Sequence, residues 1–107
     1  NLVPISIKIN VEGRVIQDQF LWDSENTDTF IMGRFALQIL SEQFGRSGFT
    51  ELSQDTKRRF SDAVTEIIRY NINVYNRIKM NDYIGTLIKE RKAQYDKQTD
   101  VQGNYVF

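Results

Sequence analysis

Hydrophobic and polar residues alternate along the first part of the chain. Apolar side chains occupy every second position from Val3 to Val11, with Pro4 or a polar residue between them. A period of two predicts a β-strand with one buried and one solvated face. Pro4 has no N–H to donate to a neighbouring strand, so we expect it at the start of the strand or on an edge.

A second extended run, Arg14–Trp22, follows the pair Glu12-Gly13. Gly13 can supply the positive φ that a two-residue hairpin turn requires. With this turn, one face of the hairpin collects the apolar residues of both runs, and a slip of one residue would expose the aromatic ones. The expected neighbours are Ile9 with Ile16, Ile5 with Phe20, and Val3 with Trp22.

The remaining sequence predicts helices that cover this hairpin, because a lone hairpin is marginally stable in water. The first helix is expected over about Thr29–Phe44, with Thr27 or Asp28 as its N-terminal cap. Gly45 stands where a glycine commonly ends a helix, and residues 46–52 are expected to form a loop.

An apolar stripe at near-helical spacing indicates the next helix, which Ser53 or Asp55 would cap. Met80–Asp82 either breaks this helix, so that Asp82 caps a third one, or lies within one long helix. We therefore predict an α+β fold, a two-stranded antiparallel β-hairpin followed by two or three packed α-helices. Residues 1–97 would form this single domain, and residues 98–107 a frayed tail.

Composition narrows the possible functions. The chain has 107 residues, the size of one domain, and 14 basic residues balance 14 acidic ones. It lacks the global basic excess that drives phosphate binding. It contains neither cysteine nor histidine, which excludes Cys/His zinc sites, cysteine nucleophiles, serine–histidine–aspartate triads and histidine bases. We predict no enzymatic activity, with no catalytic residue, metal site or cofactor site.

The sequence also bears on where the protein is located and on whether the chain is part of a longer one. No apolar run approaches the roughly 20 residues of a membrane span, and no signal peptide is visible, so we expect no membrane association. The absence of cysteine fits a reducing compartment. Because the first residue is Asn1 and not methionine, we expect the sequence to be a piece of a longer protein.

Three short blocks carry a resemblance to a known family. They are Leu2-Val3-Pro4-Ile5, Asp18-Gln19-Phe20-Leu21-Trp22-Asp23 and Phe35-Ala36-Leu37. They resemble the repeat domain of the sucrose-non-fermenting-five, or integrase-interactor, family, whose members are core subunits of SWI/SNF and RSC chromatin-remodelling complexes. The resemblance covers roughly residues 2–45. Members of the family carry two tandem repeats, whereas this sequence contains one hairpin.

The resemblance implies a fold, a partner and a place. The fold would be a unit of two strands and two helices without catalytic activity, because the motor of these complexes is a separate ATPase subunit. The unit would bind other subunits of the complex, above all the SWIRM domain of a scaffold subunit. The chain would then act in the nucleus, in the regulation of transcription through chromatin remodelling.

The apolar stripe in the second half of the chain allows two interpretations. A third helix could fold back and complete the core, or the stripe could dock a partner through an amphipathic helix. The candidate partner-binding residues are Ile72, Tyr75, Ile78, Tyr83, Ile84, Leu87 and Ile88. The residues expected to define the hairpin motif are Pro4, Gly13, Asp18, Phe20 and Trp22.

Within that motif, Phe20 and Trp22 are expected in the core rather than as anchors for a partner. Asp18 falls opposite Ile7 on the apolar face. We expect it to be a structural carboxylate that accepts hydrogen bonds from backbone N–H groups or from an arginine. The alternative is a functional acid in an apolar pocket.

Basic residues form two clusters in the helical part of the chain. Solvated helix faces, neutralised by Asp62 and Glu90, are the expected interpretation. The alternative is a nucleic-acid-binding domain that uses both clusters for contacts with phosphate. The clusters are Lys57, Arg58 and Arg59, and Lys89, Arg91 and Lys92.

Overall fold

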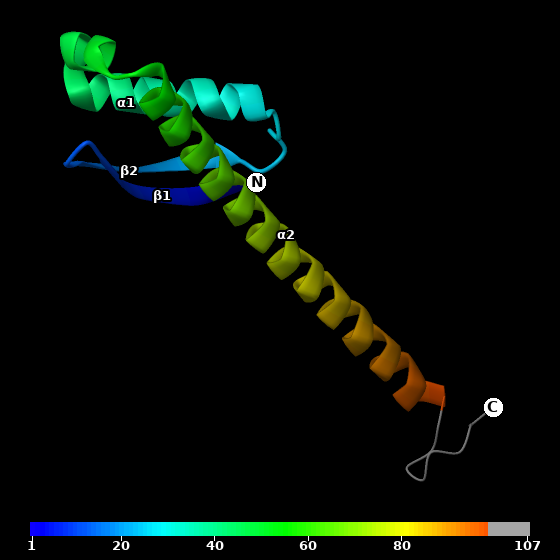
Figure 1. Cartoon of the computed structure of the whole chain (residues 1–107). Helices are drawn as coiled ribbons and strands as arrows, with labels where there is room; N and C mark the ends of the chain where they lie inside the picture. The colour runs from blue at the N-terminus through cyan, green and yellow to red at the C-terminus, as the bar shows by residue number, and fades with distance from the viewer. Residues whose placement is uncertain (99–107) are drawn as a thin grey trace. The chain divides into compact units, whose positions relative to one another are not determined.

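The computed structural model describes the backbone of residues 1–98 and the side chains of residues 1–91. The elements follow in the order β1 (Leu2–Val11), β2 (Arg14–Asp23), α1 (Thr29–Glu51) and α2 (Gln54–Gln98) (Figure 1). The predicted α+β fold, a hairpin followed by helices, is confirmed. Contacts divide the chain after Val74, so we describe a hairpin unit, Asn1–Val74, and a helical unit, which begins at Tyr75, each by itself.

The hairpin has the register that the sequence predicts. Ile9 pairs with Ile16, Ile5 with Phe20, Val3 with Trp22, and Ile7 with Asp18. Glu12 and Gly13 both adopt positive φ angles, 52° and 85°, as a type I′ turn requires. The N–H of Gly13 donates a hydrogen bond of 2.9 Å to Asn10 Oδ1, which closes the turn.

The outer edges of the two strands differ. Hydrogen-bonded pairs alternate along an antiparallel ladder starting at Val11 and Arg14, which places the ring nitrogen of Pro4 on the outer edge of β1, as expected. On the outer edge of β2, the side chain of Gln43 in α1 binds Gln17 twice. The Gln43 amide nitrogen donates to the Gln17 carbonyl at 2.9 Å, and Gln43 Oε1 accepts from the Gln17 N–H at 3.4 Å.

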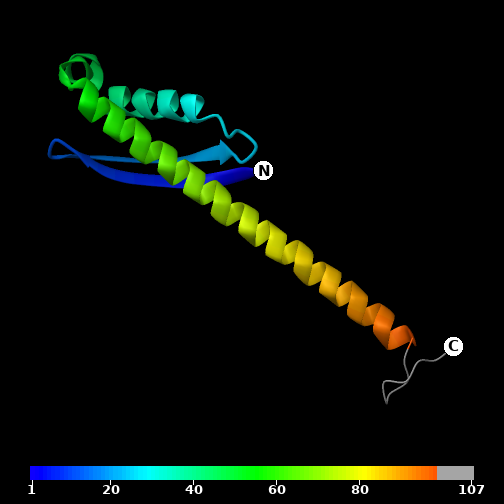
Figure 2. The ribbon, with the colours of Figure 1, turned by 45° about the vertical axis from the view of Figure 1, so that its right-hand side comes forward.

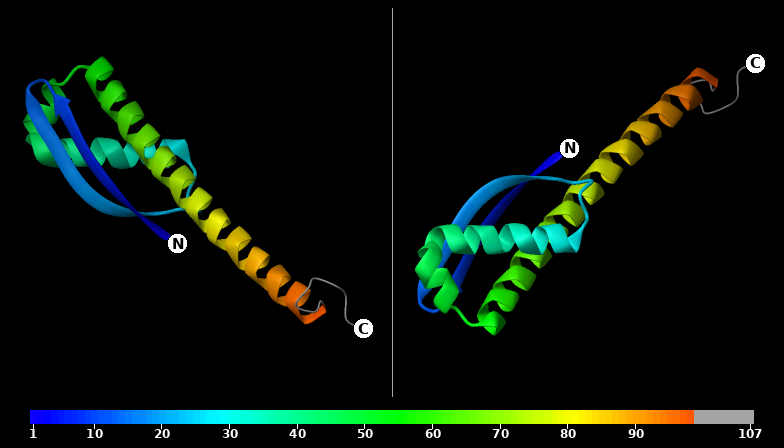
Figure 3. Two further views of the ribbon diagram at one scale, coloured as in Figure 1. Left: turned by 90° about the horizontal axis from the view of Figure 1, so that it is seen from below. Right: turned by 90° about the horizontal axis from the view of Figure 1, so that it is seen from above.

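The core of the hairpin unit lies between one face of the hairpin and the two helices. Figures 1 and 2 show the hairpin and α1 as two layers, and Figure 3 shows α1 lying across the strands. The other face of the hairpin carries exposed residues such as Lys8 and Leu21. The first part of α2 contributes a row of buried residues at a spacing of four. The buried apolar residues are Val3, Ile5, Ile7, Val11, Ile16, Trp22, Met32, Ala36, Ile39, Leu40, Leu52, Phe60, Val64, Ile68 and Ile72.

The two helices approach closely at Gly33. A Cβ atom added to Gly33 would lie 2.8 Å from the Oγ atom of Ser61 in α2, which is closer than van der Waals contact allows. Glycine therefore fills this position without a clash, although glycine is a poor helix former. The close approach brings the buried faces of α1 and α2 together over the hairpin.

α1 begins as predicted but ends later. Asp28 caps it, because its carboxylate accepts hydrogen bonds from the N–H groups of Phe30 and Ile31. Gly45 interrupts the helix with a φ of 76°, as a terminal glycine would. The predicted loop over residues 46–52 is wrong, however, since the chain is helical again up to Glu51. Buried Leu52 anchors the end of this short segment against the core.

α2 begins after Ser53, whose Oγ atom accepts a hydrogen bond of 3.1 Å from the N–H of Thr56. The helix continues through Met80–Asp82, so of the two alternatives left open by the sequence the single long helix is observed and the break is not. A third helix that folds back onto the hairpin is therefore absent from the described residues. Asn81 and Asp82 each lower the stability of a helix by only about 0.7 kcal/mol relative to alanine, which is not enough to break it. Apart from Gln98, the predicted tail over residues 98–107 lies outside the described residues.

Candidate protein-interaction surface

The helical unit carries large apolar side chains on one exposed face. Their exposed fractions lie between 40 % and 62 %. At 100° per residue, they fall within an arc of about 140° around the helix axis. We call this set the Met80–Ile88 face; its members are Met80, Tyr83, Ile84, Leu87 and Ile88.

Four of the predicted partner-binding residues belong to this face, and three do not. Ile72 is only 4 % exposed and completes the core row of the hairpin unit, so it cannot contact a partner there. Tyr75 is half-buried, with Lys79 Nζ 5.6 Å from the centre of its ring. Ile78 is exposed but points to another side of the helix.

Met80 is the member of the face that the sequence analysis missed. It was assigned to a possible helix break, although it stands four residues before Ile84. Residues at this spacing lie on the same helical face. The spacing was therefore a signal that could have placed Met80 correctly once the helix was taken as continuous.

Charged residues are distributed unevenly around the helical unit. By helical geometry, Arg77 and Arg91 lie on the Met80–Ile88 face, one at each end. Asp82, Lys79 and Lys89 lie on the opposite half of the helix, whereas Glu90 lies only about 20° outside the Tyr83 edge of the face. Among the described residues of the helical unit, Arg77 and Arg91 are therefore the charged residues inside the arc of the apolar face, and Glu90 lies beside its edge.

The aromatic residues of the hairpin motif meet in one cluster with a residue of α1. The ring of Phe35 lies 4.7 Å from that of Phe20 and 5.5 Å from that of Trp22, both in edge-on geometry. The indole N–H of Trp22 donates a hydrogen bond of 2.9 Å to the carbonyl of Asn26. Trp22 is buried and Phe20 half-buried, which favours the core role expected for both.

Asp18 has the geometry of a structural carboxylate. It lies opposite Ile7 on the covered face of the hairpin and is half-buried. Its Oδ1 atom accepts a hydrogen bond of 2.8 Å from the N–H of Gln19, which satisfies a group on the outer edge of β2. Within the described residues, no three acidic side chains gather to form a possible metal site.

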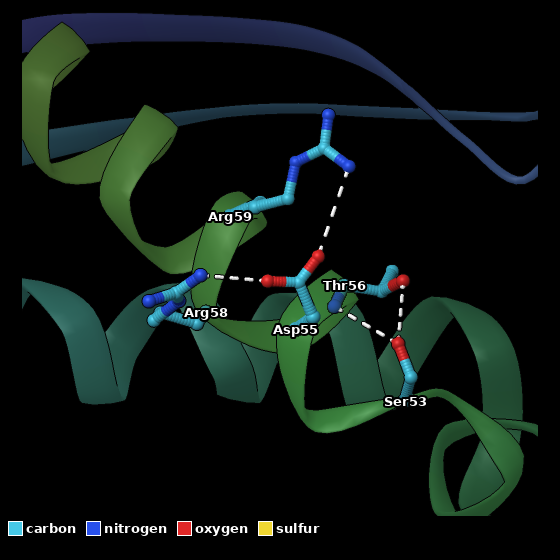
Figure 4. A network of polar contacts seen from close by, with 5 residues as sticks. All are labelled: Ser53, Asp55, Thr56, Arg58 and Arg59. Carbon is cyan, nitrogen blue, oxygen red and sulfur yellow. Dashed lines mark hydrogen bonds and ion pairs between the residues drawn. The ribbon is translucent and has the colours of Figure 1, made fainter.

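The first basic cluster is organised by an acidic residue of its own helix turn (Figure 4). The carboxylate of Asp55 lies 2.6 Å from Arg58 Nη2 and 3.8 Å from Arg59 Nη1. Lys57 Nζ stands 4.4 Å from the centre of the Phe49 ring. Asp55, rather than the expected Asp62, is therefore the neutralising residue, and such exposed pairs stabilise a fold by less than about 1 kcal/mol.

The second basic cluster belongs to the helical unit. Lys89 and Arg91 are exposed, and the side chain of Lys92 lies outside the described residues. The two clusters therefore lie in different units of the chain. No observation in the structure favours joint use of both clusters on nucleic acid, and that alternative stays a prediction.

The hairpin unit has an open hollow along α1 that is lined by both apolar and polar side chains. Its volume is about 490 Å³, and it lies where the short helical segment after Gly45 folds beside the main part of the helix. The sequence analysis missed it because that segment was predicted to be a loop. The lining residues are Ile31, Arg34, Phe35, Leu37, Gln38, Ser41 and Phe49.

Two further findings bear on identity. Neither helix, as far as it is described, is both long and apolar enough to span a membrane. Comparison with known proteins found no matching family model, no matching curated protein and no matching solved structure.

Proposed function

We propose that this chain is a non-catalytic protein-interaction module that docks a protein partner on its Met80–Ile88 face. The observation that carries the proposal is the exposure of five large apolar side chains on one helical face. The core of the hairpin unit ends at Ile72 and does not include them. Soluble proteins rarely leave such a patch uncovered unless a partner covers it, and an amphipathic helix laid against a partner is a common mode of recognition.

The resemblance to the sucrose-non-fermenting-five repeat supports a more specific proposal. Under it, the chain belongs to a core subunit of a SWI/SNF or RSC complex, acts in the nucleus, and docks the SWIRM domain of a scaffold subunit. The three blocks that carry the resemblance meet in the fold: Val3 pairs with Trp22, and Phe35 packs on Trp22. Residues that build one cluster together are more informative than three separate sequence matches.

Calorimetric titration of the 107-residue chain with a purified SWIRM domain tests this proposal. We expect binding, and a loss of at least about tenfold in affinity for the double variant Ile84→Asp/Leu87→Asp, because each aspartate would place a charge in an apolar contact. Ile78→Asp is the matched control. Ile78 is also exposed, at 57 %, but lies off the face, so its variant should bind within about twofold.

The outcomes separate the two levels of the proposal. Absence of binding at about 100 μM would overturn the SWIRM assignment, since it corresponds to less than roughly 5.5 kcal/mol of binding free energy. Undiminished binding by the double variant would show that the Met80–Ile88 face is not the docking surface. Circular dichroism and Trp22 fluorescence of each variant verify that the fold is retained.

A further inference from the structure

The two arginines on the Met80–Ile88 face restrict what can cover it. Arg77 and Arg91 are separated by 14 residues, which at 1.5 Å per residue places them roughly 21 Å apart along the helix axis. Both side chains are exposed. Ile84 stands midway between them in the sequence, so the apolar patch has a positive charge at each end.

No acidic residue stands three or four positions from either arginine along the described part of the helix. Acidic residues three or four positions away would be close enough to pair. Those positions hold Asn73, Val74, Met80 and Asn81 around Arg77, and Leu87, Ile88, Gln94 and Tyr95 around Arg91. Asp82 points to the opposite half of the helix, and Glu90, at the edge of the face beside Tyr83, is not three or four positions from either arginine. The positive charge at both ends of the face is thus available to a partner.

A second copy of the same helix does not complement this arrangement. In an antiparallel pair centred on Ile84, Arg77 of one copy would face Arg91 of the other. In a parallel pair in register, each arginine would face its own counterpart. Both pairings place like charges together, which disfavours association and selects other partners.

We propose, building on the function proposed above, that the occupant of the Met80–Ile88 face is a helix of another protein. This partner helix carries an apolar stripe with acidic side chains at both ends, roughly 21 Å apart, which meet Arg77 and Arg91. The apolar stripe of the partner supplies contact area, and its acidic ends fix the register. Pairing of two copies of this chain is disfavoured by its own arginines.

Two synthetic helical peptides test the inference. They share one leucine-rich stripe and differ only in carrying glutamates or lysines at both ends of it. By fluorescence anisotropy at about 50 mM salt, we expect the 107-residue chain to bind the glutamate peptide at least about tenfold more tightly. The difference should shrink at about 0.5 M salt, because salt screens exposed charges.

Charge reversal at the arginines provides the decisive comparison. Arg77→Glu/Arg91→Glu should invert the preference in favour of the lysine peptide. Lys79→Glu/Lys89→Glu is the matched control: it changes the net charge equally but on the opposite half of the helix. The control variant should still bind the glutamate peptide at least about fivefold more tightly than the lysine peptide, because the substituted positions lie away from the bound peptide.

Several results would overturn the inference. Equal affinity for both peptides would show that the arginines do not select the partner. Failure of both peptides to bind would show that the face does not bind a helix of this kind. Sedimentation velocity of the 107-residue chain should show a monomer at about 50 μM. A dimer that Ile84→Asp abolishes would instead identify a second copy of this chain as the occupant of the face. Tighter binding to phosphatidylserine vesicles than to the glutamate peptide would identify a lipid surface instead. Failure of the SWIRM titration alone leaves this inference standing, because the peptides contain no SWIRM sequence.

Discussion

The same substitution at two positions of α2 distinguishes the core from the exposed face. Ile68 is 0 % exposed within the hairpin unit, whereas Ile88 is 62 % exposed in the helical unit. Ile68→Ala removes buried methyl groups and leaves a cavity, which costs about 2–5 kcal/mol. Ile88→Ala loses little buried area and exchanges isoleucine for the best helix former, so its effect should stay within about 0.5 kcal/mol.

Urea unfolding followed by Trp22 fluorescence measures both effects, because Trp22 is the single tryptophan and is buried in the core of the hairpin unit. A unit of this size has a total stability of roughly 4–11 kcal/mol, so the Ile68 variant loses a large share of it. With a slope of about 2 kcal/mol/M, its midpoint should fall by about 1–2.5 M.

The Ile88 variant should retain the parental midpoint and the parental helical signal in circular dichroism. An equal loss for both variants would refute the reasoning, because it would mean that Ile88 is covered within the folded chain itself. The proposed docking face would then be part of the core.

Three other substitutions, each measured by urea unfolding, test local features of the hairpin unit. Glu12→Asn should stabilise it by about 0.5–1 kcal/mol, because asparagine tolerates the φ of 52° and forms the preferred Asn-Gly turn with Gly13; unchanged stability would contradict this. Asp28→Ala should cost about 1 kcal/mol through loss of the helix cap, and Asp28→Asn, which can still accept those hydrogen bonds, should not; equal losses would rule out the cap. In a Ser61→Ala background, Gly33→Ala should stabilise the hairpin unit by about 1 kcal/mol, because alanine is the better helix former. In the parental chain the same substitution should gain little, since Ser61 Oγ obstructs the new methyl group. Equal effects in both backgrounds would exclude the close approach of the two helices.

The hairpin is the part of the fold that the sequence predicts best. Strict alternation up to Val11 and a short turn at Glu12-Gly13 leave one register in which Phe20 and Trp22 are covered, and that register is observed. The information is local, because both strands and their turn lie within 23 residues of sequence. The expected backbone bond to Asp18 also follows from local position, since its donor is the next residue, Gln19.

The helix boundaries were harder to predict because they depend on contacts distant in sequence. Gly45 does interrupt α1, but burial of Leu52 holds the following residues in a further helical segment. Met80–Asp82 looked like a break because Asn81 and Asp82 often cap helices. Neither glycine nor proline occurs there, so nothing in the backbone forces a break.

The candidate surface was predicted only in part, because its exposure also depends on contacts distant in sequence. Spacing shows which residues share a helical face, but not which face the hairpin covers. Ile72 and Ile84 therefore looked alike in the sequence, although one lies in the core and the other is exposed. Spacing also does not show which carboxylate pairs with the first basic cluster, because Asp55 and Asp62 both stand three and four positions from Arg58 and Arg59; the structure shows the pairs with Asp55.

The paired hydrogen bonds between Gln43 and Gln17 also limit how the sheet can grow. A strand added beside β2 would need the N–H and carbonyl of Gln17, and both are already occupied by the glutamine amide. An added strand beside β1 would meet Pro4, which offers no donor, and Lys8, whose charge discourages edge-to-edge aggregation. Gln43 at the edge of β2, and Pro4 and Lys8 at the edge of β1, thus protect an open two-stranded sheet from polymerisation.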